Sequence, residues 1–283
     1  MVERQRDDER SLPVRLRDGA EHPAKAPCGA QGSVSVIHDS NLLSDTLNTE
    51  FQPLTPLERL KRLREKVTGR IVFTTSLGLE DQMLTHLIFA HDVKIEVVTL
   101  DTGRLFPETY EVWRQTEEKY GKRIHAKYPQ SAALEELIED QGIDGFYYAK
   151  EFRLTCCGAR KIEPLGRALE GATAWVTGLR GDQSQNRLSM PFVSYETGKK
   201  LIKANPLLDQ SRERIAHFND DVGVPVNALH AKGFLSIGCA PCTRAIQPGE
   251  SERAGRWWWE DDTKRECGLH VPDSTTVSEG AGI

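Results

Sequence analysis

The stretch Ile71-Val72-Phe73-Thr74-Thr75-Ser76-Leu77-Gly78-Leu79-Glu80-Asp81 decides the fold. Its first half, residues 71–75, is a short apolar run rich in β-branched residues, which predicts a buried strand. Its second half, residues 76–81, is a polar turn that leads into a helix carrying Met83 and Leu87. A strand followed by a helix is the unit of a parallel sheet, whose ligands bind beyond the carboxyl ends of the strands.

The same alternation continues along the chain. Thr55-Pro56 opens an amphipathic helix before the first strand, and Pro107 opens another after the second. We therefore expect an α/β fold with a doubly wound, mostly parallel sheet covered on both faces. The further elements expected are strands at 95–100, 123–128 and 174–177, helices at 131–140 and 158–169, and a hairpin of 192–195 with 200–203 outside the βα pattern.

Three regions differ in character. Residues 1–40 are rich in charge, Pro and Gly, and we interpret them as a flexible tail. Residues 41–232 carry the strand and helix pattern and form one domain. From residue 233 to 283 the pattern gives way to turns, cysteines, arginines and tryptophans, which is typical of a functional lid or a cluster-binding lobe.

Composition narrows the class of protein. With 37 basic and 42 acidic residues the net charge is −5, which does not favour nucleic acid as a partner. No apolar run reaches the roughly 18 residues that a membrane span needs, and the charged start of the chain is unlike a secretion signal. We expect a cytoplasmic protein, in which six cysteines indicate metal binding or catalysis before disulfides.

Two cysteine pairs lie far apart in the sequence, Cys156-Cys157 and Cys239-Ala240-Pro241-Cys242. Four thiolates can hold zinc or an iron–sulfur cluster. Adjacent cysteines diverge by about 100° on a helix, which favours a cluster over a single ion. Lys161 follows Cys157 by one helical turn and would offset the charge of the cluster. The alternative is that Cys156 and Cys157 are buried thiols and that Cys239 and Cys242 form a separate redox pair.

Cys267 stands alone near the end of the chain, in Lys264-Arg265-Glu266-Cys267-Gly268-Leu269-His270. Its basic neighbours favour a thiolate, so the residue suits a nucleophile or a redox sensor. The alternative is an ordinary free cysteine on the surface. His270 either tunes this thiol or is simply exposed.

Six motifs together resemble the assimilatory adenylyl-sulfate (APS) reductases of bacteria, the iron–sulfur branch of the phosphoadenylyl-sulfate reductase family. The resemblance covers roughly residues 50–270, and the cysteine motifs are its most specific part. The motifs are Ser76-Leu-Gly-Leu-Glu-Asp81, Leu100-Asp-Thr-Gly103, Cys156-Cys-Gly-Ala-Arg-Lys161, Thr177-Gly-Leu-Arg180, Ile237-Gly-Cys-Ala-Pro-Cys-Thr243 and Glu266-Cys-Gly-Leu-His270.

The resemblance implies an adenine-nucleotide α-hydrolase-like fold related to the ATP pyrophosphatases, in which Leu77 replaces a glycine of their phosphate loop. It also implies that Cys267 attacks the sulfur of APS, expels AMP and leaves an S-sulfocysteine. Thioredoxin, or glutaredoxin, would then release sulfite, and the family suggests a homo-oligomer. One [4Fe-4S] cluster per subunit would be held by Cys156, Cys157, Cys239 and Cys242.

The two cysteine pairs point to APS as the substrate rather than phosphoadenylyl sulfate (PAPS), although an enzyme that uses both stays open. Cations must stabilise the sulfonate and the departing phosphate. The expected catalytic and cationic residues are Lys161, Arg180, Arg187, Arg253 and Arg256, and for Arg187 a solvated loop arginine is an equal alternative. The expected nucleotide contacts are Ser76, Gly78, Asp101 and Thr102, with Ser76 near phosphate.

Two other functions compete with this prediction. One is an ATP-dependent adenylating or thiolating enzyme, and the other is a non-enzymatic metal-containing redox sensor with a vestigial nucleotide pocket. Glu80 and Asp81 have an alternative role as acids that cap the following helix. The run Trp257-Trp258-Trp259 would either dock a partner or anchor the C-terminal segment to the body.

Overall fold

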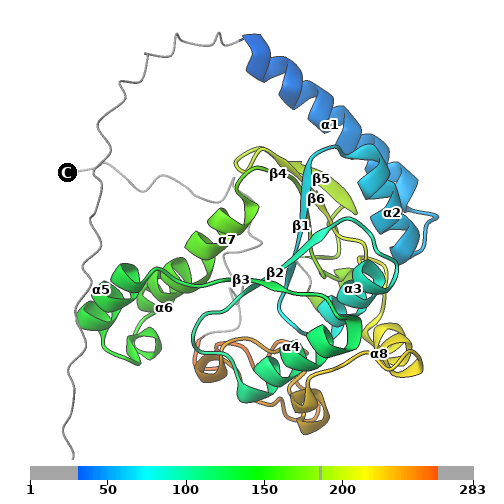
Figure 1. The fold of residues 1–283 in the computed structure, drawn as a ribbon. Helices are drawn as coiled ribbons and strands as arrows, with labels where there is room; N and C mark the ends of the chain where they lie inside the picture. The colour runs from blue at the N-terminus through cyan, green and yellow to red at the C-terminus, as the bar shows by residue number, and fades with distance from the viewer. Residues whose placement is uncertain (1–30, 185–186, 261–283) are drawn as a thin grey trace, which may run out of the picture.

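A six-stranded sheet forms the centre of the computed structural model, which describes residues 31–184 and 187–260 (Figure 1). Its strand order is β3-β2-β1-β4-β6-β5. The first five strands in this order run parallel, and only β5 at the edge is antiparallel. The strands are β1 (Arg70–Thr75), β2 (Glu96–Leu100), β3 (His125–Lys127), β4 (Ala172–Val176), β5 (Val193–Glu196) and β6 (Leu201–Ala204).

Helices cover both faces of this sheet. The larger core lies between the sheet and helices from α1 to α4 and α8, with Leu63, Phe73 and Leu84 fully buried. A second core packs α7 on the other face, through Leu165 and Trp175. The helices are α1 (Gln31–Phe51), α2 (Pro56–Lys66), α3 (Leu79–Ala90), α4 (Pro107–Tyr120), α5 (Ser131–Gln141), α6 (Lys150–Cys157), α7 (Glu163–Leu169) and α8 (Arg212–Asp221). The predicted α/β class with a doubly wound, mostly parallel sheet is confirmed.

Local sequence signals explain where helices begin. The Thr55 hydroxyl accepts a hydrogen bond from the backbone amide of Glu58, and the Glu58 carboxylate accepts one from the amide of Thr55. This reciprocal pair is a capping box, and Pro56 occupies the first turn, where a missing N–H has no cost. Pro107 starts α4 in the same way. Both starts were predicted from the sequence.

The predicted tail of residues 1–40 was too long, because α1 already begins at Gln31. Leu43, Leu47 and Phe51 recur every four residues and pack on the core, so the end of this helix has a reason to form. No Gly or Pro interrupts the chain between Gly32 and Pro53. Helix α1 therefore extends upstream into a stretch whose polar composition did not predict a helix.

Three further elements differ from the prediction. The helix expected at 158–169 is the end of a longer helical run that starts at Lys150 and passes through a π-helical turn, η2 (Gly158–Ile162). The hairpin expected outside the βα pattern belongs to the main sheet, because β6 pairs in parallel with β4. Helix α8 was not predicted.

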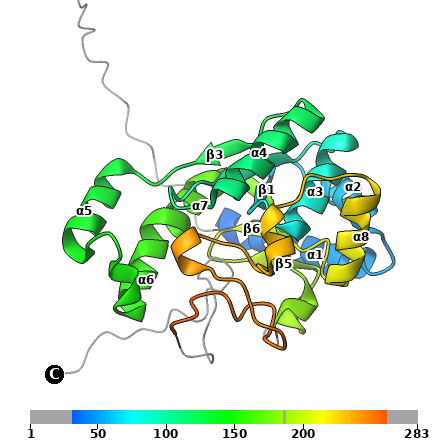
Figure 2. The same ribbon diagram turned by 90° about the horizontal axis from the view of Figure 1, so that it is seen from below.

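The C-terminal lobe, residues 233–260, has little regular structure, as its sequence indicated. It contains the short 3₁₀ turn η6 (Ala240–Cys242) and a bridge between Thr243 and Arg256. Figure 2 shows this lobe, in orange, lying beside α6. Within the described parts of the chain, no helix is both long and apolar enough to cross a bilayer.

The buried Arg59 joins α2 to the end of α1 and to the segment after β6. Its guanidinium pairs with Asp209 and donates to the carbonyl oxygens of Phe51 and Pro206, both at 2.8 Å. We predict that Arg59→Leu lowers the free energy of unfolding by about 3 kcal/mol, because these acceptors lose a charged donor. Urea denaturation followed by tryptophan fluorescence measures the loss. Arg62→Leu, which breaks a pair with Glu50 that water still reaches, should cost less than about 1 kcal/mol, and equal losses would contradict the prediction.

Candidate active site

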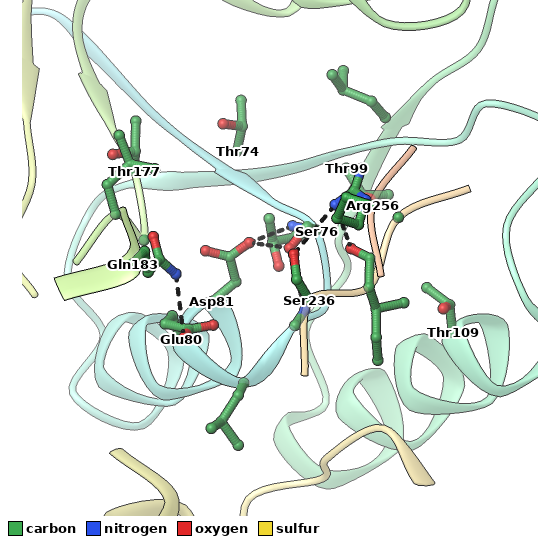
Figure 3. A pocket seen from close by; sticks show the side chains of 18 of the residues that line it. Thr74, Ser76, Glu80, Asp81, Thr99, Thr109, Thr177, Gln183, Ser236 and Arg256 are labelled. Carbon is green, nitrogen blue, oxygen red and sulfur yellow. Dashed lines mark hydrogen bonds between the residues drawn. The ribbon is translucent and has the colours of Figure 1, made fainter. Parts of the chain in front are cut away.

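A pocket opens at the carboxyl ends of β1, β2 and β4 (Figure 3). This is the position that a parallel sheet offers to a ligand. One part of its wall is apolar and includes Leu100, Leu165 and Trp175. Such a surface suits a flat aromatic base. Of the residues that the sequence assigned to substrate, the pocket is lined by Ser76, Gly78, Thr102, Lys161, Arg187, Arg253 and Arg256.

Four of these lining residues are basic. Lys161 comes from the π-helical turn η2, Arg187 from the loop after β4, and Arg253 and Arg256 from the C-terminal lobe. Arg256 is buried, and its guanidinium donates to the hydroxyl of Ser236 at 3.5 Å (Figure 3). Cations held in a pocket of low dielectric attract an anion more strongly than cations in water. This part of the pocket therefore suits a phosphate or a sulfonate.

The carboxylate of Asp81, in the first turn of α3, occupies the turn after β1. Asp81 accepts hydrogen bonds from the amide of Ser76 at 2.5 Å and from its hydroxyl at 2.6 Å (Figure 3). A Cβ atom at Gly178 would lie 2.0 Å from Asp81, so only glycine leaves room for this carboxylate. Leu77 adopts φ +60°, the left-handed conformation that glycine favours. The groups expected near phosphate are thus already paired within the turn.

Arg180 lies behind the pocket and does not line it. Its buried guanidinium pairs with Glu80 at 2.8 Å, with Glu252 at 2.6 Å and with Asp182. Burial raises the pKa of Glu252, and Arg180 opposes that rise. These contacts make Arg180 an anchor that ties the C-terminal lobe to the start of α3, where the sequence suggested a substrate contact.

Asp101 also lies outside the pocket lining. Its carboxylate accepts hydrogen bonds from the amide of Gly103 and the hydroxyl of Tyr110, both at 2.8 Å. Burial and this carboxylate raise the pKa of Tyr110 to about 12. Asp101 therefore holds the turn after β2 in shape, while the neighbouring Thr102 faces both the pocket and the cysteines.

All four cysteines of the two pairs line one second cavity. Among residues 31–184 and 187–260, no three His, Cys, Asp or Glu side chains are arranged to hold a single metal ion. Burial acts to raise the pKa of Cys239, but Lys161 and the Thr102 hydroxyl at 3.3 Å outweigh it, and the pKa is lowered. Burial raises the pKa of Cys242 to about 12. The cavity is lined by Cys156, Cys157, Cys239 and Cys242, with Arg104, Arg153, Arg160 and Lys161 around them.

The polar atoms around this cavity fit an electron-rich group. Nη1 of Arg153 and Nε of Arg160 are buried and have no hydrogen-bond partner within the described structure. An unsatisfied buried donor is costly, and each such group calls for an acceptor. Four thiolates with cationic donors around them are the ligands and surroundings of an iron–sulfur cluster. The residues present therefore fit a four-cysteine cluster better than a single ion.

Lys161 lines both the pocket and the cysteine cavity. The π-helical turn η2 that carries it interrupts the helical run immediately after Cys157. Such turns are frequent at functional sites, because the extra residue re-aims the side chains that follow. Lys161 thus forms part of the wall between the two cavities, which we call the shared wall.

The structure adds His230, which sequence reasoning missed because it lies in no recognisable motif. Its Nδ1 is 2.8 Å from the carbonyl oxygen of Phe234, so this nitrogen carries the proton. Its Nε2 is buried without a partner within the described structure, and the residue lines the pocket. Burial lowers the pKa of His230. A neutral His230 would offer Nε2 as an acceptor to a ligand. Cys267 and His270 lie outside the described residues.

The fold and the two cavities define a doubly wound α/β protein with a ligand pocket at the carboxyl ends of its strands and an adjoining cavity lined by four cysteines. The family model of the phosphoadenosine phosphosulfate reductase domain matches residues 70–245. This chain belongs to that family.

Curated relatives agree with the family assignment. The chain is 54% identical to adenosine 5'-phosphosulfate reductase of Rhizobium meliloti over 208 residues, which cover 74% of this chain and 78% of the relative. It is 46% identical to the reductase of the same name from Allochromatium vinosum, over 81% of this chain and 89% of the relative. A crystal structure of PAPS reductase from Candida auris superposes with a TM-score of 0.61 at 25% identity, over 72% of this chain and 96% of that one.

The buried carboxylate of Asp81 in the turn after β1 predicts how the stability of the protein changes with pH. Burial raises the pKa of Asp81 from 3.8 to about 6, while hydrogen bonds from Ser76 oppose the rise. Between pH 4 and 6 the folded protein therefore binds more protons at this site than the unfolded chain, so Asp81 contributes less stability as pH rises. Urea titrations of the wild type and of Asp81→Asn measure the free energy of unfolding of each protein. We expect the wild-type value minus the Asp81→Asn value to fall as the pH rises from 4 to 6. A difference that stays constant or rises with pH would contradict the burial argument.

Proposed function

We propose that this protein is an adenylyl-sulfate reductase that converts APS to sulfite and AMP with electrons from thioredoxin, in the assimilation of sulfate toward cysteine. The shared wall is the observation that carries the proposal, because Lys161 lies between a nucleotide-sized pocket and a four-cysteine cavity. The names of the curated relatives support the same reaction. The two cysteine pairs favour APS over PAPS.

The two halves of the pocket suggest how APS binds. Its base would lie against the apolar part near Leu165 and Trp175. Its phosphosulfate would then reach Lys161 and the arginines of the C-terminal lobe. Because Asp81 fills the turn after β1, that turn does not compete for the phosphosulfate. The same pairing weakens the alternative of an ATP pyrophosphatase, whose phosphate loop must stay open to anions.

The reaction would proceed by two displacements at sulfur. The Cys267 thiolate attacks the sulfur of APS, the S–O bond breaks, and AMP leaves with the bonding electrons. A thiolate of thioredoxin then attacks the sulfur of Cys267, and sulfite leaves with the electron pair of the S–S bond. The second thiol of thioredoxin resolves the mixed disulfide, so the dithiol supplies both electrons. Glutaredoxin could replace thioredoxin in this scheme.

Cations must offset the charge when a thiolate approaches a sulfonate. Lys161, Arg253 and Arg256, which line the pocket, would do this and would stabilise the departing phosphate. A [4Fe-4S] cluster, held by Cys156, Cys157, Cys239 and Cys242, would add fixed negative charge that orients these cations. The donors of Arg153 and Arg160 would satisfy its sulfur atoms. The expectations of a cytoplasmic location, of a homo-oligomer and of a separate lobe at 233–283 stay part of this proposal.

Covalent modification of the protein tests the reaction directly. We expect APS, in the absence of any reductant, to add one sulfonate to Cys267, and thioredoxin to remove it with release of sulfite. Intact-protein mass spectrometry under anaerobic conditions measures both steps, and Cys267→Ser is the matched control. PAPS in a parallel reaction should modify the protein more slowly. If neither nucleotide modifies enzyme that contains its full complement of iron, the reductase proposal is wrong and the redox sensor becomes the better hypothesis.

Removing the cation of the shared wall should slow the first displacement. We predict that Lys161→Met lowers the single-turnover rate of Cys267 modification by about 10²–10³, since it removes one preorganised charged donor. Arg244→Met is the control, because this arginine pairs with Glu250 and lines neither the pocket nor the cysteine cavity. A rate for Lys161→Met within twofold of the wild type would show that this lysine does not stabilise the reacting group.

A further inference from the structure

The guanidinium of Arg256 is fixed at the point where it lines the pocket. The residue is only 7% exposed. Its Nη1 donates to the hydroxyl of Ser236 at 3.5 Å (Figure 3) and to the carbonyl oxygen of Ile237 at 3.4 Å. A cation that is already held in place needs little rearrangement when an anion arrives, so its position in the pocket determines how well it binds that anion.

The tryptophan that follows Arg256 helps to keep this arginine in place. The ring of Trp257 is buried, and its centroid lies 4.8 Å from Cζ of Arg256 and 4.5 Å from Cζ of Arg153, an arrangement that we call the tryptophan stack. Trp257 has a φ of +44°, a left-handed conformation that costs free energy in a bulky residue. Its amide donates to the carbonyl oxygen of Cys242 at 3.2 Å. The buried stack favours the interpretation that the tryptophan run anchors the lobe over docking of a partner.

Gly238 leaves the space that the guanidinium occupies. A Cβ atom on Gly238 would lie 2.6 Å from Cζ and 3.0 Å from Nη1 of Arg256, and closer still to Nη2. The guanidinium thus lies where any other residue would carry its side chain. Gly238 is not one of the glycines with a positive φ, so its backbone conformation suits other residues as well. The need for glycine at this position is therefore steric.

A side chain at position 238 would displace the guanidinium without blocking the fold of the lobe. The three atoms nearest to the added Cβ all belong to the end of the flexible Arg256 side chain, and none of them is a backbone atom. Carbon atoms in ordinary contact are about 3.5–4.0 Å apart, so the guanidinium would have to move by about 1 Å. It would then weaken its contacts with Ser236 and Ile237. A shift of this size in a group that binds a reacting anion can cost about 10²-fold in rate.

Gly238 is itself held by the turn that carries two of the cysteines. Its amide donates to the Thr243 hydroxyl at 3.1 Å, and this hydroxyl donates to the carbonyl oxygen of Cys239 at 2.9 Å. The 3₁₀ turn η6, which ends at Cys242, follows directly. The surface that Arg256 rests against therefore belongs to the same turn as Cys239 and Cys242.

We propose that Gly238 is a positioning residue for the reaction, because its missing side chain leaves the space that holds the Arg256 guanidinium where the anion of the substrate binds. The inference rests on the proposed function in taking this anion to be the phosphosulfate of APS. Gly238 acts through Arg256 and has no side chain with which to contact the substrate. The sequence motif around Gly238 assigned functions to its cysteines, and the structure assigns one to its glycine.

Equilibrium binding tests the proposal without turnover. Cys267→Ser protein that contains its full complement of iron is titrated with APS and, separately, with adenosine, by calorimetry under anaerobic conditions. Gly238→Ala in this protein should weaken APS binding by about 10- to 100-fold. It should leave iron content unchanged and adenosine affinity within about twofold, because adenosine carries no anion for Arg256 to bind. Gly166→Ala is the matched control, since a Cβ atom on this exposed glycine of α7 meets nothing within 4 Å.

A double-mutant cycle separates displacement of Arg256 from general damage to the site. Arg256→Ala alone should weaken APS binding at least as much as Gly238→Ala does. Adding Gly238→Ala to Arg256→Ala should change the APS affinity by less than about threefold, because the group that needs the space is already gone. An equal loss from Gly238→Ala in both backgrounds, or an equal loss of adenosine and APS affinity, would overturn the proposal.

A crystal structure of Gly238→Ala examines the space itself. We expect the guanidinium of Arg256 to lie about 1 Å or more from its wild-type position. If it stays in place and the turn at Cys239 moves instead, the proposal is wrong. If the Cys267→Ser protein binds adenosine but not APS, the reductase proposal fails, and the crystal structure still decides whether Gly238 positions Arg256.

Discussion

A guanidinium removed from water is stabilised by a carboxylate beside it, and in this protein such pairs hold the layers together. Arg59 joins α2 to Asp209, Arg180 joins the loop after β4 to Glu80 and Glu252, and Arg153 joins α6 to Glu260. The last two pairs tie the C-terminal lobe to the body of the fold. This lobe has almost no helix or strand hydrogen bonding of its own, so ion pairs and the tryptophan stack determine where it lies. The walls of the pocket that Arg253 and Arg256 contribute depend on these attachments.

Charge also explains how the pocket is divided. A thiolate and a phosphosulfate repel each other, so a site for their reaction needs cations where they meet and an environment without excess anions nearby. The cations line the part of the pocket next to the cysteine cavity, while Asp81 is turned inward and satisfied by Ser76. The carboxylates of Glu80 and Glu252 are neutralised by Arg180. Arg212 lies within 4 Å of both of these carboxylates as well, so the two acids share two arginines on the side of the pocket away from the cysteines.

Much of the fold was predictable because it follows from local patterns. The apolar strands, the capping box at Thr55 and the first-turn prolines depend on residues close together in the sequence, and each appeared where expected. The start of α1 was missed because its sequence is largely polar, and α8 was missed because it is held by contacts with α3, which is distant in the sequence. For the candidate site, the cysteine pairs and the basic residues were identified by their motifs. The same motifs could not reveal that Arg180 and Asp101 form their hydrogen bonds with neighbouring protein groups.

The sequence by itself determined the class of fold, the family and the four cysteines that line one cavity, because periodicity and motif spacing are properties of the chain alone. Only the tertiary structure decided which polar groups face a ligand. Ser76 meets Asp81 instead of an anion, His230 reaches the pocket from a short 3₁₀ helix without a motif, and Arg153 meets Glu260 across more than a hundred residues. Such choices depend on which buried charges and donors find partners when the layers close. That is a competition among all the groups brought together, and no local pattern records its outcome.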